Sequence, residues 1–383
     1  MSDSSIPFGR PQLDGAAFDA VRDVLESGML VHGKVTPAFE EAFAERIGAK
    51  HAVAVSSCTA GLHLTLFVKG IGPGDRVAVP AMTHVATAHS VELQGAEPVF
   101  VDVDPETGNM DPARLAAVEG PLAAVMPVHY LGLPCDMDRI AAVAKDKGAF
   151  ILEDCALAVD ATWDGRKAGT LGLAGSFSFY PVKHMTSIEG GMVTTDDEAL
   201  ATELRRRRAF GYNRALGERA RPGIYDVDVL GMNYRMSEVE AAVGLAQVAR
   251  LDEFMAARAR NDAVLRAILL EIDGLTIFPD SHGKAVSSHY CLNAVLPSDG
   301  SVSRDRLVDA LKAAGIGSSV HYPGPVPLFT YYKEKYGYSA GSFPVAEWLA
   351  EQTISLPVGP HLSVDDAERV GNAFRDAYIG SSV

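Results

Sequence analysis

The segment with the clearest chemical potential, 175–191, centres on Lys183. This lysine follows an apolar run, with two hydroxyl side chains before it, two after it, and the glycine pair Gly190 and Gly191 beyond. A lysine that forms a Schiff base needs such a setting, because its amine must be desolvated, held at a rigid strand end and close to phosphate donors. A surface lysine in a loop is the simpler interpretation of the segment alone.

An acidic pair, Glu153 and Asp154, ends another apolar run at 150–152. Pyridoxal 5'-phosphate (PLP) acts as an electron sink only while its pyridine nitrogen stays protonated, and a carboxylate held against that nitrogen keeps the proton there. Asp154, at the carboxyl end of a central strand, could do this. A helix cap or a metal ligand is an equally good interpretation of the pair alone.

A third segment, 55–62, runs from an apolar strand through small hydroxylated residues into a helix. Phosphates commonly bind at such places, because the first N–H groups of a helix are free and the helix dipole is positive there. Thr59 and Ala60 lie at this point. Simple N-capping by Ser57 or Thr59 is the alternative.

The elements that would position these residues alternate along the chain. From about residue 50, short apolar runs are followed by helix-like stretches, which is typical of a largely parallel sheet covered by helices. The strands we expect are 52–55, 76–79, 98–103, 123–128, 150–152, 176–180 and 192–195, with helices at 59–68 and 84–93. A site is expected at the carboxyl edge of such a sheet.

The C-terminal part has a different order of elements. A charged helical stretch from Ser237 to about Leu270 is expected to bridge two domains. A strand and two helices follow, at 289–296, 304–314 and 364–378. We therefore expect a large domain over residues 1–250, with its N-terminal segment packed on the small domain, and a smaller α+β domain over 251–383.

The charge of the chain narrows its partners. A formal net charge of -15 argues against a general nucleic-acid or anionic-membrane surface, because such a surface would repel phosphates at long range. A small anion would instead need local donors and helix N-termini. With 48% hydrophobic and 22% charged residues, the composition is that of a soluble globular protein.

The cysteines and the N-terminus suggest a compartment. Four cysteines lack CxxC spacing, which favours reduced thiols over a disulfide or zinc framework, and we expect no metal. Residues 1–14 contain no basic stretch followed by an apolar core, and no apolar run approaches the roughly 20 residues that span a bilayer. We expect a cytoplasmic protein.

Taken together, the motifs resemble the DegT/DnrJ/EryC1/StrS sugar aminotransferases. In the family's order, the chain has Ser57-Cys-Thr-Ala60, Pro80-Ala-Met-Thr-His-Val-Ala-Thr87, Glu153-Asp154, Lys183 between Ser178-Phe-Tyr-Pro181 and Glu189-Gly-Gly191, and Gly231-Met-Asn-Tyr-Arg-Met-Ser237. Later matches are Val320-His-Tyr-Pro323, Phe343-Pro-Val-Ala-Glu347 and Ser355-Leu-Pro357. The resemblance runs from about residue 5 to residue 375.

The resemblance implies a PLP-dependent aminotransferase of fold type I, an α/β fold that usually forms a homodimer with active sites at the subunit interface. On the family's pattern, Lys183 forms the Schiff base and carries protons, while Asp154 pairs with the pyridine nitrogen. The implied phosphate ligands are Thr59, the Ala60 backbone, Ser178 and, from the partner subunit, Asn233. His84 lies where the family stacks an aromatic residue on the cofactor ring, although a helix cap or core packing is the ordinary role of such a histidine.

Several positions near the site need separate interpretation. A branch of this family has histidine in place of the lysine and dehydrates its sugar, but Lys183 is present, so the adjacent His184 does not place the chain in that branch. Three positions depart from the common pattern: Leu157 for a glutamine, Ile188 for a glycine and Pro327 for a histidine. The first bears on the cofactor, and the other two bear on sugar recognition.

A run of four cations, Arg205–Arg208, lies on an expected helix. It is interpreted as a solvated face or as a complement to the negative end of the helix dipole. The alternative is a docking point for the diphosphate of a nucleotide sugar.

The resemblance implies transfer of an amino group from an amino acid, expected to be L-glutamate, to a nucleotide-linked keto sugar in polysaccharide biosynthesis. A 4-keto-6-deoxyhexose is favoured. The alternatives are a PLP-dependent sugar dehydratase on the same scaffold, a keto-inositol aminotransferase and a non-catalytic PLP-fold regulator. No helix-turn-helix extension or basic arm supports a regulator, and no dinucleotide or P-loop motif supports a nicotinamide or ATP enzyme.

Overall fold

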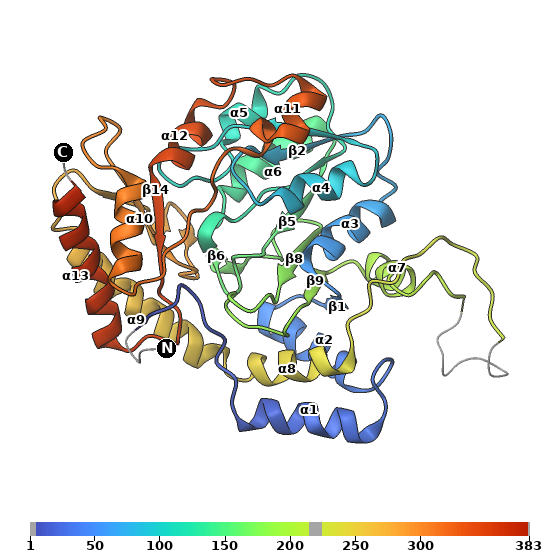
Figure 1. The fold of residues 1–383 in the computed structure, drawn as a ribbon. Coiled ribbons are helices and arrows are strands. Elements are labelled where there is room, and N and C mark those ends of the chain that lie inside the picture. Colours follow the sequence, from blue (N-terminus) through green and yellow to red (C-terminus); the bar gives the residue numbers. More distant parts are fainter. Residues whose placement is uncertain (1–4, 214–223, 382–383) are drawn as a thin grey trace.

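The computed structural model describes residues 5–213 and 224–381. Its main body contains a seven-stranded sheet in the order β1-β9-β8-β5-β4-β2-β3 (Figure 1). In chain order these strands are β1 (His51–Val55), β2 (Arg76–Pro80), β3 (Glu97–Val101), β4 (Ala124–Val125), β5 (Phe150–Asp154), β8 (Ala174–Ser178) and β9 (Gly191–Thr195). Only β9 runs against its neighbours. The prediction of a largely parallel sheet is confirmed, and the antiparallel β9 makes the sheet mixed.

The seven predicted strands are present, but the fourth is shorter than predicted. Pro127 has no N–H with which to continue a ladder, so β4 stops at Val125. The Pro127 carbonyl still accepts a hydrogen bond from the Asp154 N–H at 2.9 Å. This bond keeps the end of β5 beside the segment that leaves β4.

Helices cover both faces of this sheet. They are α1 (Gly15–Ser27), α2 (Val35–Ile47), α3 (Cys58–Val68), α4 (Val85–Glu92), α5 (Pro112–Ala116), α6 (Met137–Lys147), α7 (Glu198–Arg207) and α8 (Glu238–Val248). Alternate strand residues face opposite sides: Val53 and Val55 pack with α3, α4 and α7, whereas Ala52 and Ala54 pack with α2 and α8. The expected α/β layering is thus present, although the N-terminal helices α1 and α2 were not predicted.

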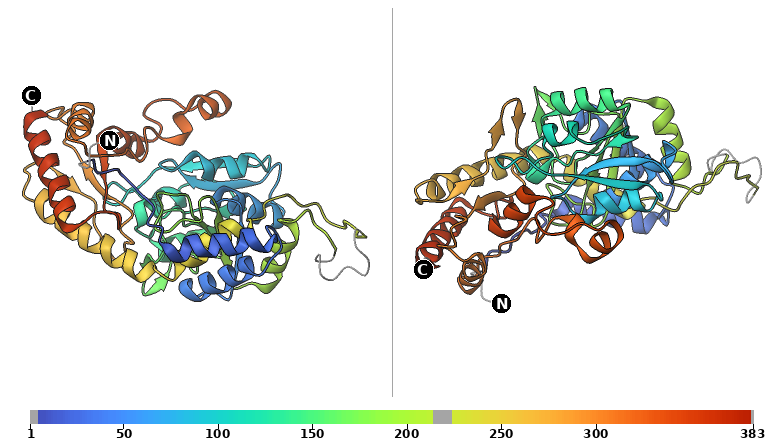
Figure 2. Two further views of the ribbon diagram at one scale, coloured as in Figure 1. Left: turned by 60° about the horizontal axis from the view of Figure 1, so that its bottom comes forward. Right: turned by 90° about the horizontal axis from the view of Figure 1, so that it is seen from above.

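The helix predicted from Ser237 to Leu270 is wrong as a single element. It consists of α8 and α9 (Leu251–Leu269), and Arg250 between them leaves helical geometry with φ -107° and ψ 4°. The two helices follow different partners, because α8 packs on α1 and α2 whereas α9 packs on α13 (Val364–Ser381). Figure 2 shows α9 and α13 side by side, at one end of the molecule.

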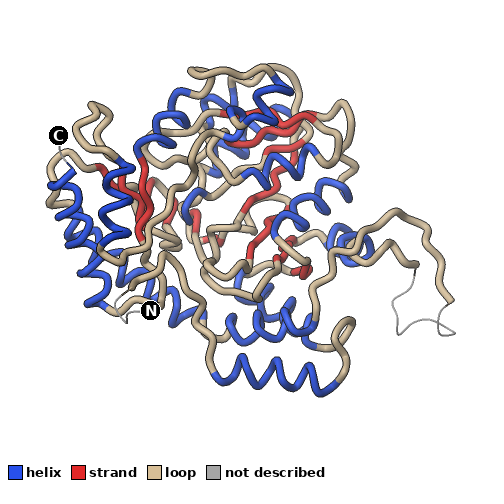
Figure 3. The backbone as a smooth tube through the Cα atoms, in the orientation of Figure 1, coloured by secondary structure: helices blue, strands red, loops and turns tan. Residues whose placement is uncertain are grey.

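A second, three-stranded sheet lies beside these helices (Figure 3). It contains β10 (Thr276–Ile277), β13 (Leu292–Val295) and β14 (Thr353–Leu356), and α10 (Arg304–Ala313) packs with it. The predicted strand 289–296 begins late, because His289 has φ 51°, which a strand does not accommodate. The N-terminal residue Ile6 exchanges backbone hydrogen bonds with Gly315 and Gly317. The division of the chain at residue 250 stays a prediction.

Further short elements connect the two parts. Four short strands, β6 (Thr162–Trp163), β7 (Arg166–Lys167), β11 (Ser281–His282) and β12 (Ala285–Val286), form a sheet that draws on both halves of the chain. Two single-turn helices are η1 (Tyr130–Gly132) and η3 (Val326–Leu328), followed by α11 (Thr330–Tyr336) and α12 (Pro344–Gln352). Tyr332 on α11 packs against Phe100 of β3, with ring centroids 5.3 Å apart. The late segment 326–352 therefore covers the edge of the main sheet.

Two expectations about compartment can be compared with the fold. None of the helices in the described residues is both long and apolar enough to cross a membrane. All four cysteines are buried and unpaired, as expected of reduced thiols.

The cations of the Arg205–Arg208 run are engaged within the chain. Arg205 and Arg208 both bind the carboxylate of Glu40 on α2, and Arg205 also donates to the Ala52 carbonyl at 2.9 Å. Arg206 pairs with Asp228 and Arg207 pairs with Glu203. The run lies at the end of α7, where cations complement the helix dipole. Because carboxylates of the chain already hold these side chains, the arrangement does not support a diphosphate docking point here.

We expect Glu40→Gln to lower the free energy of unfolding by about 2–3 kcal/mol, because it leaves two cations without their shared counter-charge. The expected loss is smaller than for a fully buried pair, since the Arg205 side chain is 39% exposed. Denaturant titration followed by circular dichroism measures it. Glu41→Gln, an exposed neighbour on the same helix, is the matched control. Equal stability of the two variants would contradict the structural role of Glu40.

Candidate active site

Lys183 lies in the turn that follows β8. Its backbone N–H donates to the Tyr180 carbonyl at 3.0 Å, and its Nζ lies 5.2 Å from the centre of the Tyr290 ring. Burial lowers the pKa of this amine, while Cys58 and Asp154 oppose the shift. A lower pKa increases the fraction of neutral amine, which is the nucleophilic form. The structure therefore gives Lys183 the desolvated strand-end setting that the sequence predicted.

Asp154 is the last residue of β5 and is 4% exposed. Its Oδ2 accepts a hydrogen bond from the Thr87 hydroxyl at 2.8 Å, and its Oδ1 accepts one from the Ala156 N–H at 3.1 Å. The Cys58 thiol lies 3.9 Å from Oδ1, and burial followed by the charge of Asp154 holds the pKa of that thiol well above its ordinary value. The carboxylate is thus fixed in position at the carboxyl edge of the sheet, beside the lysine.

Strand register brings the two predicted phosphate segments together. Gly191 of β9 pairs with Val55 on one side and with Ser178 on the other. A Cβ on Gly191 would lie 2.5 Å from the Cys58 backbone nitrogen, so only glycine allows this approach. The start of α3 and the Ser178 hydroxyl therefore flank one strand end.

The start of α3 also carries a cap. The Ser57 side chain accepts a hydrogen bond from the Ala60 N–H at 3.0 Å, so the N-capping alternative is present for Ser57. Thr59 lies in the first turn, whose N–H groups have no acceptor within the helix. The Ser178 hydroxyl accepts from the Tyr180 N–H at 3.4 Å. An anion at this place would meet N–H groups, two hydroxyls and the positive end of the helix dipole.

His84 caps α4, with Nδ1 accepting from the Ala86 N–H at 3.2 Å. Its ring centre is 6.0 Å from that of Tyr322. Partial burial lowers the pKa of His84, and the nearby Lys183 lowers it further. The ordinary capping role is therefore present, and the ring also borders the lysine.

The neighbouring residues singled out in the sequence have distinct surroundings. His184 is buried, and its Nε2 lies 3.0 Å from the Ser288 carbonyl. Leu157 is buried in the core, and Pro327 is buried in η3. Ile188 has φ 76°, which explains why glycine is frequent at that position in the family.

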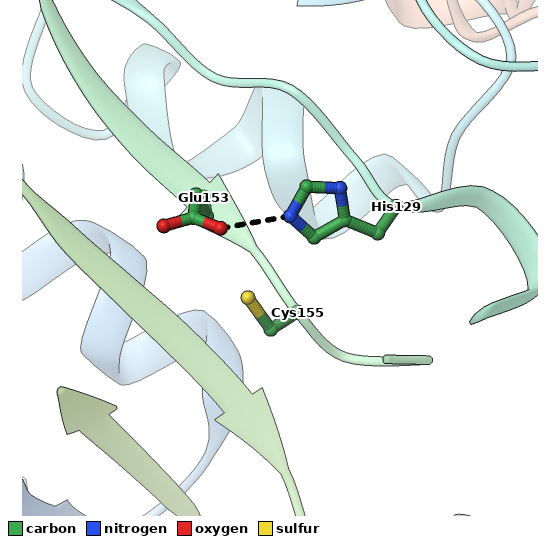
Figure 4. Close-up of side chains that lie close together, drawn as sticks. All are labelled: His129, Glu153 and Cys155. Carbon is green, nitrogen blue, oxygen red and sulfur yellow. Dashed lines mark hydrogen bonds and ion pairs between the residues drawn. The ribbon is translucent and has the colours of Figure 1, made fainter. Parts of the chain in front are cut away.

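The cluster of His129, Glu153 and Cys155 behind the site has the residue types of a metal centre (Figure 4). Its hydrogen bonds indicate another role. The Glu153 carboxylate accepts bonds from His129 Nε2 at 2.9 Å and from the N–H groups of Gly169, Leu171 and Gly172. His129 Nδ1 accepts from the Cys135 N–H at 3.2 Å. Both ring nitrogens are thus in use, and the cluster anchors the strand end that carries Asp154.

Sequence reasoning assigned no role to three side chains at this site. Thr87 holds the Asp154 carboxylate, Tyr290 lies under the lysine amine, and Tyr322 borders His84. Thr87 lay within a motif already noted, so its spacing from His84 was an available signal. The two tyrosines are distant in sequence from Lys183, and no local pattern marks Tyr290.

The donor set fits PLP. A buried amine, a fixed carboxylate and an anion-binding helix start lie at one edge of the sheet, which matches the aldehyde, the pyridine nitrogen and the phosphate of that cofactor.

Comparisons with known proteins agree with this arrangement. The sequence profile of the DegT/DnrJ/EryC1/StrS aminotransferase family matches residues 11–375. The chain is 41% identical to the spore coat polysaccharide biosynthesis protein SpsC of Bacillus subtilis (strain 168), over 98% of each chain.

Two solved structures are similar over nearly their whole length. The Streptococcus pneumoniae protein Spr1654, solved in a PLP-form, is 28% identical with a TM-score of 0.92, over 99% of this chain and 100% of that one. DesI, solved in the presence of its TDP-sugar product, is 33% identical with a TM-score of 0.88, over 99% of this chain and 94% of that one. The chain belongs to the DegT/DnrJ/EryC1/StrS aminotransferase family, and it is a PLP-dependent aminotransferase that acts on sugars.

Proposed function

We propose that the protein transfers the amino group of L-glutamate to a nucleotide-linked keto sugar, with a 4-keto-6-deoxyhexose as the favoured acceptor. The observation that carries the proposal is the buried Lys183 amine beside the fixed Asp154 carboxylate. The nucleotide-linked acceptor is supported by DesI, whose structure was solved with a TDP-sugar product. A role in polysaccharide biosynthesis is supported by the name of SpsC.

In this proposal each residue has a chemical task. Bound PLP supplies an aldehyde that takes up the amino group and a ring that accepts the electron pair of the broken bond. Lys183 holds the cofactor through its amine and then moves the substrate proton with the same Nζ. Asp154 keeps the pyridine nitrogen protonated. The hydrogen bonds from Thr87 and Ala156 hold Asp154 in place for this task.

The phosphate end is assigned to Thr59, the Ala60 backbone and Ser178. Because the Ala60 N–H donates to Ser57, that hydroxyl would have to be exchanged for a phosphate oxygen. Thr59 needs no such exchange, because its backbone N–H lies in the first turn of α3 and has no acceptor within the helix. His84 is proposed to cover one face of the cofactor ring. The capping hydrogen bond from the Ala86 N–H orients its imidazole.

A homodimer with shared active sites is the proposed assembly. Residues 209–213 and 224–233 leave the body side by side (Figure 1), joined by the Tyr212–Val227 and Ala209–Asn233 bridges. Ile224 and Leu230 on this extension are 68% and 71% exposed, and Phe18 on α1 is 57% exposed. Burial of these apolar side chains by a second subunit would stabilise the dimer.

Asn233 is the residue proposed to cross the interface. It is exposed at the base of the extension, and its neighbour Tyr234 accepts a backbone hydrogen bond from Ser56 at 2.9 Å. That contact places Asn233 near the α3 start of its own chain as well.

Asp154→Asn should leave the fold intact and lower kcat by several powers of ten, because an amide cannot hold the pyridinium proton by charge. Turnover, PLP content and thermal unfolding are measured together. Asp146→Asn, an exposed carboxylate on α6, is the matched control. A folded, PLP-loaded Asp154→Asn enzyme with near-normal kcat would refute the assignment.

Mixing inactive Lys183→Ala with inactive Asn233→Ala protein should restore about a quarter of the sites, since half of the random dimers are mixed and each of these has one intact site. Subunit exchange is verified by mass spectrometry of differently tagged chains. Verified mixed dimers without activity would mean that Asn233 serves its own chain.

Incubation with nitrogen-15 glutamate and a panel of nucleotide-linked keto sugars should give one sugar with the label on a ring carbon. An equal amount of 2-oxoglutarate is expected, because the donor loses the nitrogen that the sugar gains. Mass spectrometry and NMR locate the label. Labelling of a keto-inositol, with none of the nucleotide sugars accepted, would overturn the proposed acceptor and favour the inositol alternative.

A further inference from the structure

Arg258 on α9 is a buried cation. It is 4% exposed, and within the described residues its guanidinium donates to backbone carbonyls and to no carboxylate. Burial lowers the pKa of this guanidinium to about 10, so it still carries its charge at neutral pH. A buried cation without a counter-ion is costly unless hydrogen bonds stabilise it. The groups that Arg258 binds therefore indicate its role.

The carbonyls that Arg258 binds belong to the active site. Its Nη2 donates to the carbonyl of Lys183 at 3.1 Å. Its Nη1 donates to the carbonyl of Tyr290 at 2.9 Å and to that of His289 at 3.3 Å. The Lys183 amine lies over the Tyr290 ring. One guanidinium thus fixes the backbone from which the lysine starts and the backbone from which its neighbouring ring starts.

Two imidazoles make the surroundings suitable for this cation. His184 Nε2 and His361 Nε2 face the carbonyls of Ser288 and Pro7, so each ring carries its proton there and has a lone pair on its buried Nδ1. Burial lowers the pKa of both rings, which keeps them neutral. Both residues line the same cavity as Arg258 and Lys183. Because both rings are neutral, they do not repel the Arg258 cation.

The cavity is narrow at Gly359. A Cβ on this glycine would lie 2.6 Å from His361 Nδ1 and 3.9 Å from Arg258 Nη2. Gly359 therefore lies against both the imidazole and the guanidinium.

We propose that Arg258 is a positioning residue for the aminotransferase reaction, which fixes the Lys183 amine relative to the Tyr290 ring by binding the backbone carbonyls of Lys183 and Tyr290. The inference rests on the proposed role of Lys183. Arg258 comes from α9, which packs on β13 and α13, so it also ties the lysine turn to the second sheet. Its effect is geometric, because the planar fork of donors reaches both carbonyls at once.

Three variants separate this role from general effects on α9. Arg258→Met removes both donors at similar length. Arg258→Lys keeps the charge, but one ammonium cannot reproduce the fork. Arg260→Met is the matched control, because exposed Arg260 lies two residues along and donates to the Leu362 carbonyl at 3.2 Å, away from the lysine.

The first measurement needs no substrate. The full-length protein freed of PLP is acetylated over a range of pH, and peptide mass spectrometry gives the midpoint of Lys183 modification. Arg258→Met and Arg258→Lys should both move this midpoint upward toward that of an ordinary lysine, because a loosened amine gains water. Cys58, Asp154 and Cys291 act on the amine in every variant, so they do not account for the difference. Arg260→Met should leave the midpoint unchanged.

The second measurement uses the PLP-loaded enzyme. The pH midpoint of the cofactor absorbance change should shift in both Arg258 variants, and kcat should fall about 10- to 100-fold while KM for the sugar changes less than about threefold. An unchanged acetylation midpoint in Arg258→Met would overturn the proposal, as would full recovery in Arg258→Lys or an equal effect in Arg260→Met.

Two further outcomes, an unfolded variant and an unreactive wild-type enzyme, still leave the role of Arg258 testable. Should Arg258→Met fail to fold by circular dichroism, Arg258→Lys and Arg258→Gln give the same comparison. If the wild-type enzyme turns over none of the proposed sugars, the acetylation and absorbance midpoints still test Arg258, so failure of the proposed acceptor is distinguishable from failure of this inference.

Discussion

The burial of a single amine is the constraint on which the rest of this structure depends. In the proposed function Lys183 acts as a nucleophile in its neutral form, and burial lowers its pKa in that direction. The same burial would be useless if the amine could move, so its backbone is held by the turn at Tyr180 and by Arg258. The fold therefore provides a desolvated site and the hydrogen bonds that keep the lysine in it.

A mixed sheet explains how distant segments meet around that amine. Because β9 runs antiparallel between β1 and β8, Gly191 lies next to both the start of α3 and Ser178. The parallel strand β5 delivers Asp154 to the same edge. Behind it, Glu153 receives four hydrogen bonds that fix the strand end. Neighbouring residues at the end of β5 thus have different roles. Glu153 anchors the strand end, and Asp154 faces the site.

Features that depend on local sequence could be predicted, whereas features that depend on distant contacts could not. The strands and the setting of Lys183 follow from short apolar runs and their flanking residues. The break at Arg250 could not be seen, because both flanking segments are good helices and only their packing partners differ. The late start of β13 reflects a positive φ at His289, a conformation that the residue type does not predict. Tyr290 and Arg258 reach the lysine from far along the chain, so their roles appear only in three dimensions.

The start of α3 shows why a motif alone does not establish a ligand. The sequence supported both a phosphate site and a simple cap, and the structure has the cap from Ser57 to the Ala60 N–H. The two interpretations are compatible, because a hydroxyl that caps a helix occupies the direction from which a phosphate oxygen would approach. The phosphate binding proposed at this place would exchange one weak acceptor for a charged one, and charge-assisted hydrogen bonds are stronger than neutral ones. The cap thus keeps the N–H group satisfied and oriented without the anion, and the stronger charge-assisted bond would favour the proposed exchange.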